Sequence, residues 1–190
     1  MTNIPEAAKL IKGGFIRLDP RTNAIVQILA FESNPRTLSR SLVNPPEATP
    51  NSEPHEVIRF TLVLDAPDPP QGSGVTTVAI GIYPLLSALE LLLYVPAGPE
   101  ETIPLIVFVW GHFRVLPVRL SEFQIVEQKF DAELNPIHAE IGVVLRVLKD
   151  ADLPPDSLAR RLWDTHLIEL QQLASQAPAA TLADLGLSAV

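Results

Sequence analysis

The sequence predicts a mainly β protein, a barrel or sandwich of six to eight strands with one short packed helix and a C-terminal α-helical extension. Three observations support this class. Short apolar segments of strand length recur through the first 150 residues, separated by turns rich in Pro, Gly and Asn. One segment near residue 85 has leucines at helical spacing instead. After two consecutive prolines at 154–155 the pattern becomes that of a single amphipathic helix. The chain therefore divides into a β domain at 1–150 and a helical extension at 151–190.

The first strands are expected at Phe15–Arg17 and Ala24–Phe31, joined by a turn at 19–23 that contains Asp, Pro and Asn. Pro35 then takes the chain out of the sheet, because proline cannot donate to a ladder. A proline-rich arm follows at 44–56. It has almost no apolar content, so we expect it to lie on the surface.

A strand with apolar residues on both faces is expected at Val57–Leu64, followed by a loop at 65–74. The segment Val75–Pro96 is nearly long enough to span a bilayer, which takes about 20 apolar residues. Pro84 interrupts it, Glu90 lies inside it, and no basic residues flank it. It is better read as a strand, a break and a short buried helix that opens at Tyr83-Pro84, and we expect no membrane insertion.

The second half of the β domain begins with a buried strand at Leu105–Trp110. A short strand at Phe113–Val118 contains Pro117, which predicts an edge or a bulge. A strand at Arg119–Phe130 and a turn at 135–136 precede the last strand, Ile137–Leu148. On that strand, alternation places six apolar residues on one face: Ile137, Ala139, Ile141, Val143, Leu145 and Val147.

The extension is predicted to be a helix capped by Asp156 or Ser157. Its apolar stripe consists of Leu158, Leu162, Trp163, Leu167, Leu170, Leu173 and Ala174. Ala177-Pro178 ends this helix, and Thr181–Leu185 forms at most one further turn before a glycine. The stripe has to pack on the chain's own barrel or on a neighbour. Deletion of 156–190 is expected to leave a folded β domain and to weaken assembly.

Composition excludes several functional classes. The net charge is −8 and the 14 basic residues are scattered, which argues against nucleic-acid binding. The absence of cysteine excludes disulfides, thiolate metal sites and cysteine catalysis. Apolar residues make up 47% of the chain and charged residues 19%, a balance that favours surface hidden between subunits. Residues 1–12 lack the features of a signal peptide.

No catalytic or cofactor site is predicted. The four histidines are far apart in sequence and none forms a metal-binding pair. The glycines at 13–14 and around Ser73 lack the spacing of a phosphate-binding loop or a nucleophile elbow. Glu90, expected to be buried, has no partner acid. We therefore expect a protein that is not an enzyme and that binds no cofactor or metal.

Four segments, taken in order, resemble one family. Phe31–Ser39 resembles an F-x-x-N-P-x-x-(L/Y)-S element, and Tyr83–Glu90 is similar to a short helix of the same family. Val107–Gly111 matches an F-x-W-G strand end, and Phe130–Ala139 resembles an F-D-x-x-L-N-P-(I/V)-x-A turn. The family is that of the tube proteins of contractile injection systems, which are phage-tail-like particles. The members that these motifs resemble are the baseplate tube-initiator proteins, which often carry a C-terminal LysM domain.

The resemblance covers about 11–148 and implies a phage tail-tube-like β domain. The implied assembly is a homo-hexameric ring that joins the inner tube to the spike and baseplate proteins. The particle would be assembled in the cytoplasm of a bacterium and be either released or membrane-anchored. The residues carried over as assembly and turn motifs are Asn34, Pro35, Trp110, Gly111, Phe130, Asp131, Asn135 and Pro136.

The sequence departs from the family after residue 153, where nothing has the shape of a LysM module, so peptidoglycan binding is not expected. Two alternatives stay open. One is a tube terminator or cap adaptor of the same particle. The other is a small β-barrel carrier of an apolar ligand, for which the apolar composition is the motive.

Overall fold

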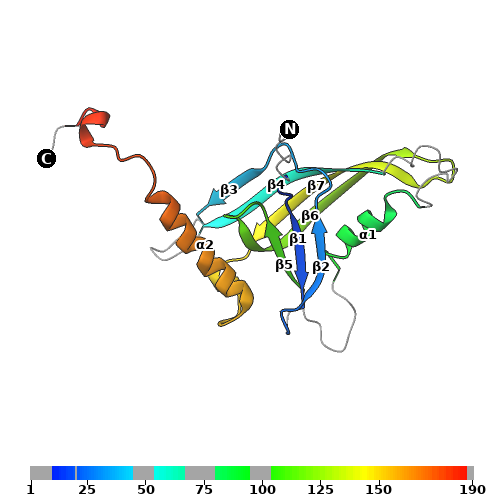
Figure 1. Cartoon of the computed structure of the whole chain (residues 1–190), viewed down its shortest axis with the longest axis horizontal. Helices are drawn as coiled ribbons and strands as arrows, with labels where there is room; N and C mark the ends of the chain where they lie inside the picture. The colour runs from blue at the N-terminus through cyan, green and yellow to red at the C-terminus, as the bar shows by residue number, and fades with distance from the viewer. Residues whose placement is uncertain (1–9, 20, 45–53, 67–79, 95–103, 188–190) are drawn as a thin grey trace, which may run out of the picture.

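The computed structural model describes residues 10–19, 21–44, 54–66, 80–94 and 104–187. Its strands form one antiparallel sheet in the order β2-β1-β5-β6-β7-β4-β3 (Figure 1). The strands are β1 Gly14–Leu18, β2 Ile25–Ala30, β3 Ser39–Val43, β4 His55–Asp65, β5 Leu105–Val109, β6 Val115–Phe130 and β7 Pro136–Val147. The mainly β class is confirmed, and seven strands fall within the predicted six to eight.

The sheet curves so strongly that its two halves face each other. β1 and β4 are separated by three strands in the sheet, yet the rings of Phe15 and Phe60 lie 6.4 Å apart. Phe31 and Phe108 complete this cluster, and the ring centroids of its four phenylalanines lie 5.3–6.5 Å from one another. Figure 1 shows β1, β2 and β5 lying across the long strands β4, β6 and β7. This aromatic cluster is the centre of the core, and such pairs add about 0.5–1.5 kcal/mol each beyond their area burial.

The alternation predicted for the long strands is confirmed. On β7, Ala139, Ile141, Val143, Leu145 and Val147 are all buried. On β4 the buried residues are Ile58, Phe60, Leu62 and Leu64. Coverage of the second face of β4 is only partial, because Val57 is half-buried but Val63 is 38% exposed.

Pro117 is neither on an edge strand nor in a bulge, so that prediction is wrong. Val115–Phe130 is a single strand, and Pro117 is fully buried between β5 and β7. The Pro117 carbonyl points towards β7 and accepts from the amide of Leu148, just beyond the end of that strand. An amide on Pro117 would point the same way, to where the β6–β7 ladder has already stopped, so the sheet tolerates its absence. The register shifts of the β6–β7 pair lie further along, between Leu120 and Glu122 and again between Glu127 and Phe130.

Two predictions before β5 need correction. β3 was not predicted, although it pairs in regular register with β4 from Ser39↔Arg59 to Val43↔His55. The proline-rich arm at 44–56 is also shorter than expected, because His55 and Glu56 belong to β4 and Glu56 is buried. Residues 45–53 of the arm lie outside the described residues, as do residues 75–79 of the strand expected before Pro84.

The short helix α1 is Tyr83–Glu90, as predicted, with proline in its first turn. It covers the sheet through the buried residues Leu86 and Leu89, and Leu92, just after the helix ends, is buried as well. Glu90 was expected to be buried, but it is exposed because it points away from this face. A buried catalytic carboxylate on α1 is therefore excluded.

The extension contains the 3-10 turn η1 Asp150–Asp152, the helix α2 Leu158–Ala174 and the 3-10 turn η2 Leu182–Leu185. Ser157 caps α2 by accepting from the amide of Arg160 at 3.1 Å. Figure 1 shows α2 at the end of the sheet opposite α1, with η2 standing away from the body of the molecule. The single turn expected at 181–185 before Gly186 is confirmed, and Gly186 has φ +70°.

Candidate functional site

The residues predicted to form the assembly motifs fall into two groups at opposite ends of β6. Asn34, Pro35, Trp110 and Gly111 lie near its start, and the turn from Phe130 to Pro136 lies at its end. β6 has 16 residues, so at roughly 3.3 Å per residue its ends are about 50 Å apart. The structure therefore provides two separate sites in place of one.

Asn34 anchors the chain that leads into β1. Its side-chain oxygen accepts from the Gly13 amide at 2.8 Å, and its side-chain nitrogen donates to the Ile11 carbonyl at 2.9 Å. Both contacts are with residues more than 20 positions away. The Asn-Pro pair thus fixes the path of a distant segment as well as starting a turn, while Pro35 itself is only half-buried.

Trp110 lies directly over Gly13. A Cβ on Gly13 would be 2.6 Å from Cε3 of the indole, so only glycine leaves room for the ring there. The indole also continues the aromatic core, because the Phe108 ring lies nearly parallel to it with the centroids 6.3 Å apart. The Trp110 amide donates to the Arg114 carbonyl across a turn in which Gly111 has φ +69°. Gly111 is the residue type that adopts this backbone at least cost.

The second group forms the β6–β7 turn, and Asp131 organises it. Its carboxylate accepts from the amides of Glu133 and Asn135 and from the side-chain amide of Asn135. The hydrogen bond from the Asn135 side chain is the main reason that the pKa of Asp131 lies below its usual value. Phe130, expected to anchor this hairpin, is 47% exposed. The turn is held by Asp131 and Asn135, and Phe130 only pairs with Pro136 in the ladder.

The tail-docking residues are only partly buried. Of the five predicted, Trp163 is buried, Leu158, Leu162 and Leu167 are half-buried, and Leu170 is 41% exposed. Trp163 joins the hydrophobic core cluster, and α2 packs on β6. The first half of α2 therefore docks on its own sheet.

His166 is a buried residue of α2 that the sequence did not single out. It is 3% exposed, and neither ring nitrogen has a hydrogen-bond partner among the described residues. Burial is the main reason that its pKa is lowered, and Arg40 acts in the same direction. Glu56, Glu169 and the backbone of Phe113 raise the pKa, although the Phe113 backbone approaches the ring without completing a hydrogen bond. The one sequence feature that points to this histidine is Trp163, three residues earlier on the same helix, whose ring lies 5.8 Å from the His166 ring.

His166 lines a cavity of about 470 Å³ between α2 and the turn after β5. Asn34, Trp110 and Gly111 of the predicted set line it too, together with Arg40 and Arg114. No acidic side chain is found among the described residues of its wall. Arg40 is held by buried Glu56 at 2.5 Å, whereas Arg114 has no ion pair assigned to it among the described residues. The wall chemistry suits an anionic group with an apolar neighbour.

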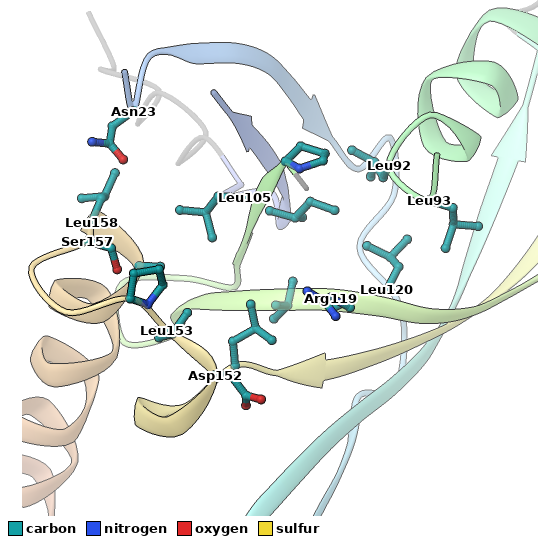
Figure 2. Close-up of a pocket in the computed structure, with 16 residues that line it drawn as sticks. Asn23, Leu92, Leu93, Leu105, Arg119, Leu120, Asp152, Leu153, Ser157 and Leu158 are labelled. Atoms are coloured by element: carbon teal, nitrogen blue, oxygen red, sulfur yellow. The ribbon is translucent and has the colours of Figure 1, made fainter. Parts of the chain in front are cut away.

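A second pocket, of about 400 Å³, lies between the end of α1, the start of β6 and the start of α2 (Figure 2). Figure 2 shows Leu105, Leu120, Leu153 and Leu158 gathered around it, with Arg119 also on its wall. Ligand pockets in proteins span about 300–1,000 Å³, so this one is large enough for a small apolar group.

Both edges of the sheet expose apolar side chains. β2 and β3 have a strand partner on one side only within the described part of the chain. Their exposed residues are Ile25, Val26, Ile28, Leu42 and Val43, each more than half exposed. Unprotected edges of this kind are templates for pairing with another chain.

Other kinds of site were sought in the described ranges. No group of three His, Asp or Glu residues there is placed to hold a metal ion. None of the helices described has both the length and the apolar character needed to cross a membrane.

The chain matches no known family model and no curated protein in sequence, so any assignment of function depends on its own residues and geometry.

Proposed function

We propose that this protein is a structural, ring-forming component of a contractile injection system, joining the inner tube to the baseplate and spike. The single observation that carries the proposal is the pair of apolar, one-sided edge strands, β2 and β3, at the two ends of one curved sheet. The four ordered sequence motifs that resemble the tube-protein family supply the identity of the particle.

The mechanism is head-to-tail pairing of sheets. β2 of one copy adds to β3 of the next, so that each copy contributes an open, curved sheet and the ring closes the barrel. Such a contact is heterologous, because it joins two different surfaces, and it gives a closed ring when the rotation between copies closes. Six copies are proposed from the family resemblance. The Asp131 hairpin and the exposed C-terminal half of the extension remain accessible for contact with neighbouring rings or baseplate proteins.

Lysine substitution at the edges tests this proposal, because charged edge residues oppose strand addition. Ile28→Lys on β2 and Leu42→Lys on β3 change side chains that are 62% and 54% exposed, so both variants fold. Native mass spectrometry and negative-stain microscopy are expected to show hexameric rings for the wild type and monomers for both variants. Val144→Lys is the matched control and keeps the ring, because Val144 is half-buried on β7 and paired with a strand on each side.

A wild-type chain that stays monomeric at high concentration would overturn the ring. The particle is tested separately by co-purification with sheath and tube proteins and by the neighbouring genes. A genome in which no sheath, tube or spike gene lies nearby would remove the injection system from the proposal. The same co-purification distinguishes the alternative position, because a tube terminator or cap adaptor would bring down different partner proteins from a tube-to-baseplate adaptor.

A second candidate function is the carriage of an apolar ligand, favoured by the pocket in Figure 2. A monomer that binds one molecule of a fluorescent fatty acid with micromolar affinity would support it. Loss of that binding in Leu105→Asp, with no loss in Val126→Asp, would assign the ligand to this pocket.

A further inference from the structure

The C-terminal turn at 181–187 is folded, but its three leucines are exposed in the described part of the chain. Leu182, Leu185 and Leu187 are 51%, 71% and 56% exposed. Figure 1 shows the turn beyond the end of α2, away from the sheet. Three leucines held together in water on a short segment cost solvation free energy unless another surface covers them.

The backbone of this turn is nevertheless fully organised. The Thr181 amide and hydroxyl both donate to the Asp184 carboxylate, at 2.7 and 2.9 Å. The Leu187 amide donates to the Leu182 carbonyl at 2.9 Å, and Gly186 adopts the left-handed conformation that closes the turn. A segment that already has its bound shape loses less entropy on binding, which is the property of a docking element.

The pocket of Figure 2 has the complementary character. It is lined mainly by leucine, isoleucine and valine, and Arg119 stands exposed at its wall. Asp152, the acidic residue of this wall, is bound by Arg146, whereas no ion pair of Arg119 is assigned among the described residues. The tail has no Lys or Arg after Arg161, so Asp184 is a negative charge on an apolar, otherwise uncharged turn.

The turn cannot reach the pocket of its own chain. Ser157 and Leu158, at the start of α2, line the pocket, and helical hydrogen bonding continues to Ala177. Twenty helical residues span about 30 Å. The link from Ala177 to Thr181 takes four Cα-to-Cα steps, which extend to about 14 Å at most. Without unwinding α2, the turn can enter only the pocket of another molecule.

We propose that the C-terminal turn Thr181–Leu187 of one copy docks into the pocket between α1, β6 and α2 of a neighbouring copy. Leucines of the turn fill the pocket, and Asp184 lies near Arg119 of the neighbour. Donor and acceptor are different surfaces, so the contact is heterologous and repeats from copy to copy. The identity of the neighbour rests on the proposed ring, whereas the complementarity of turn and pocket does not.

Engineered cysteines test the docking directly, because the chain contains no cysteine of its own. Leu185→Cys places a thiol on the turn, and Leu93→Cys places one at the pocket, where Leu93 is 41% exposed. The two variants are purified separately, mixed and treated with a short bis-maleimide. We expect a covalent heterodimer within minutes, at least tenfold faster than from Leu185→Cys mixed with Leu134→Cys. Leu134 is the matched control because it is 74% exposed on the distant hairpin.

A chain carrying both cysteines separates docking within a chain from docking between chains. Covalent multimers are expected, and a cyclised monomer would overturn the proposal. Cross-linking no faster than the Leu134→Cys control would overturn it as well.

The ring and the tail exchange can fail independently. Hexamers without the specific cross-link would retain the ring and reject the docking. The specific cross-link in open chains that never close would retain the docking and reject the ring. Absence of both association and cross-link rejects both.

Discussion

Gly81 lies so close to Pro136 that a Cβ on the glycine would be 2.1 Å from the proline carbonyl oxygen. The same carbonyl accepts from the Ile82 amide at 2.8 Å, and Gly81 has φ +56°. Gly81→Ala is therefore expected to lower the free energy of unfolding by about 2–4 kcal/mol, from overpacking and a left-handed backbone. Urea denaturation measures it.

The matched control is Gly142→Ala on β7. A Cβ there meets only Gln124, at 3.6 Å or more, which is ordinary contact. Its unfolding free energy should stay within about 1 kcal/mol of the wild type. Equal unfolding free energies for the two variants would show that Gly81, just before α1, does not pack against Pro136 at the β6–β7 turn.

Asp131 is predicted to protect the hairpin from acid. Its pKa is lowered in the folded chain, mainly by the Asn135 side chain, so the carboxylate stabilises the fold above its unfolded pKa. That stability is lost as the pH falls through the lower folded pKa. NMR titration of the Asp131 carboxyl carbon should give a pKa below 3.8, the ordinary value. In Asn135→Ala the value should rise towards 3.8, and a wild-type value at or above 3.8 would contradict the geometry.

Most of the sheet could be predicted from sequence because its strands are buried on one face. β4 and β7 alternate strictly, and their core faces were correct at every position from residue 58 to 64 and from 139 to 147. β3 could not be found in this way. Ser39, Arg40 and Ser41 break the alternation, and an edge strand with two exposed apolar residues buries too little to leave a pattern. Its partner, β4, supplies the ladder that makes it a strand.

The candidate site was less predictable. The sequence motifs identified the turns correctly but could not show that Asn34 reaches Ile11 and Gly13, more than 20 residues away. His166 was indistinguishable from a surface histidine, because half of the positions on an amphipathic helix face water. Its burial depends on how α2 packs beside Arg40 and Glu56, and long-range packing leaves no local signal.

His166 is predicted to make the fold sensitive to mild acid. Its folded pKa is lowered, chiefly by burial, so the unfolded chain binds more protons below about pH 6.5. The free energy of unfolding should fall as the pH drops from 7 towards 5. The slope for one proton cannot exceed about 1.4 kcal/mol per pH unit. His166→Gln is expected to flatten this slope, measured by urea denaturation at each pH.

The matched control is His112→Gln, which changes an exposed histidine on the wall of the same cavity. It retains buried His166 and must therefore retain the acid sensitivity that depends on it. A His166→Gln slope equal to that of the wild type would mean that other groups cause the loss.

The two halves of the extension are predicted to differ in what they stabilise. Sequence alone favoured deletion of 156–190 as harmless to folding, but Ala159 and Trp163 lie in the core cluster. Truncation after residue 155 is now expected to destabilise the sheet, and Trp163→Ala to cost about 3–5 kcal/mol. Truncation after residue 174 removes residues that are exposed wherever the structure describes them, at 175–187, and should leave the unfolding free energy unchanged. Leu173→Ala, at a site 37% exposed, is the point-variant control. An unfolded 1–174 chain would show that the tail contributes to the core, and would remove the basis for its exchange between copies.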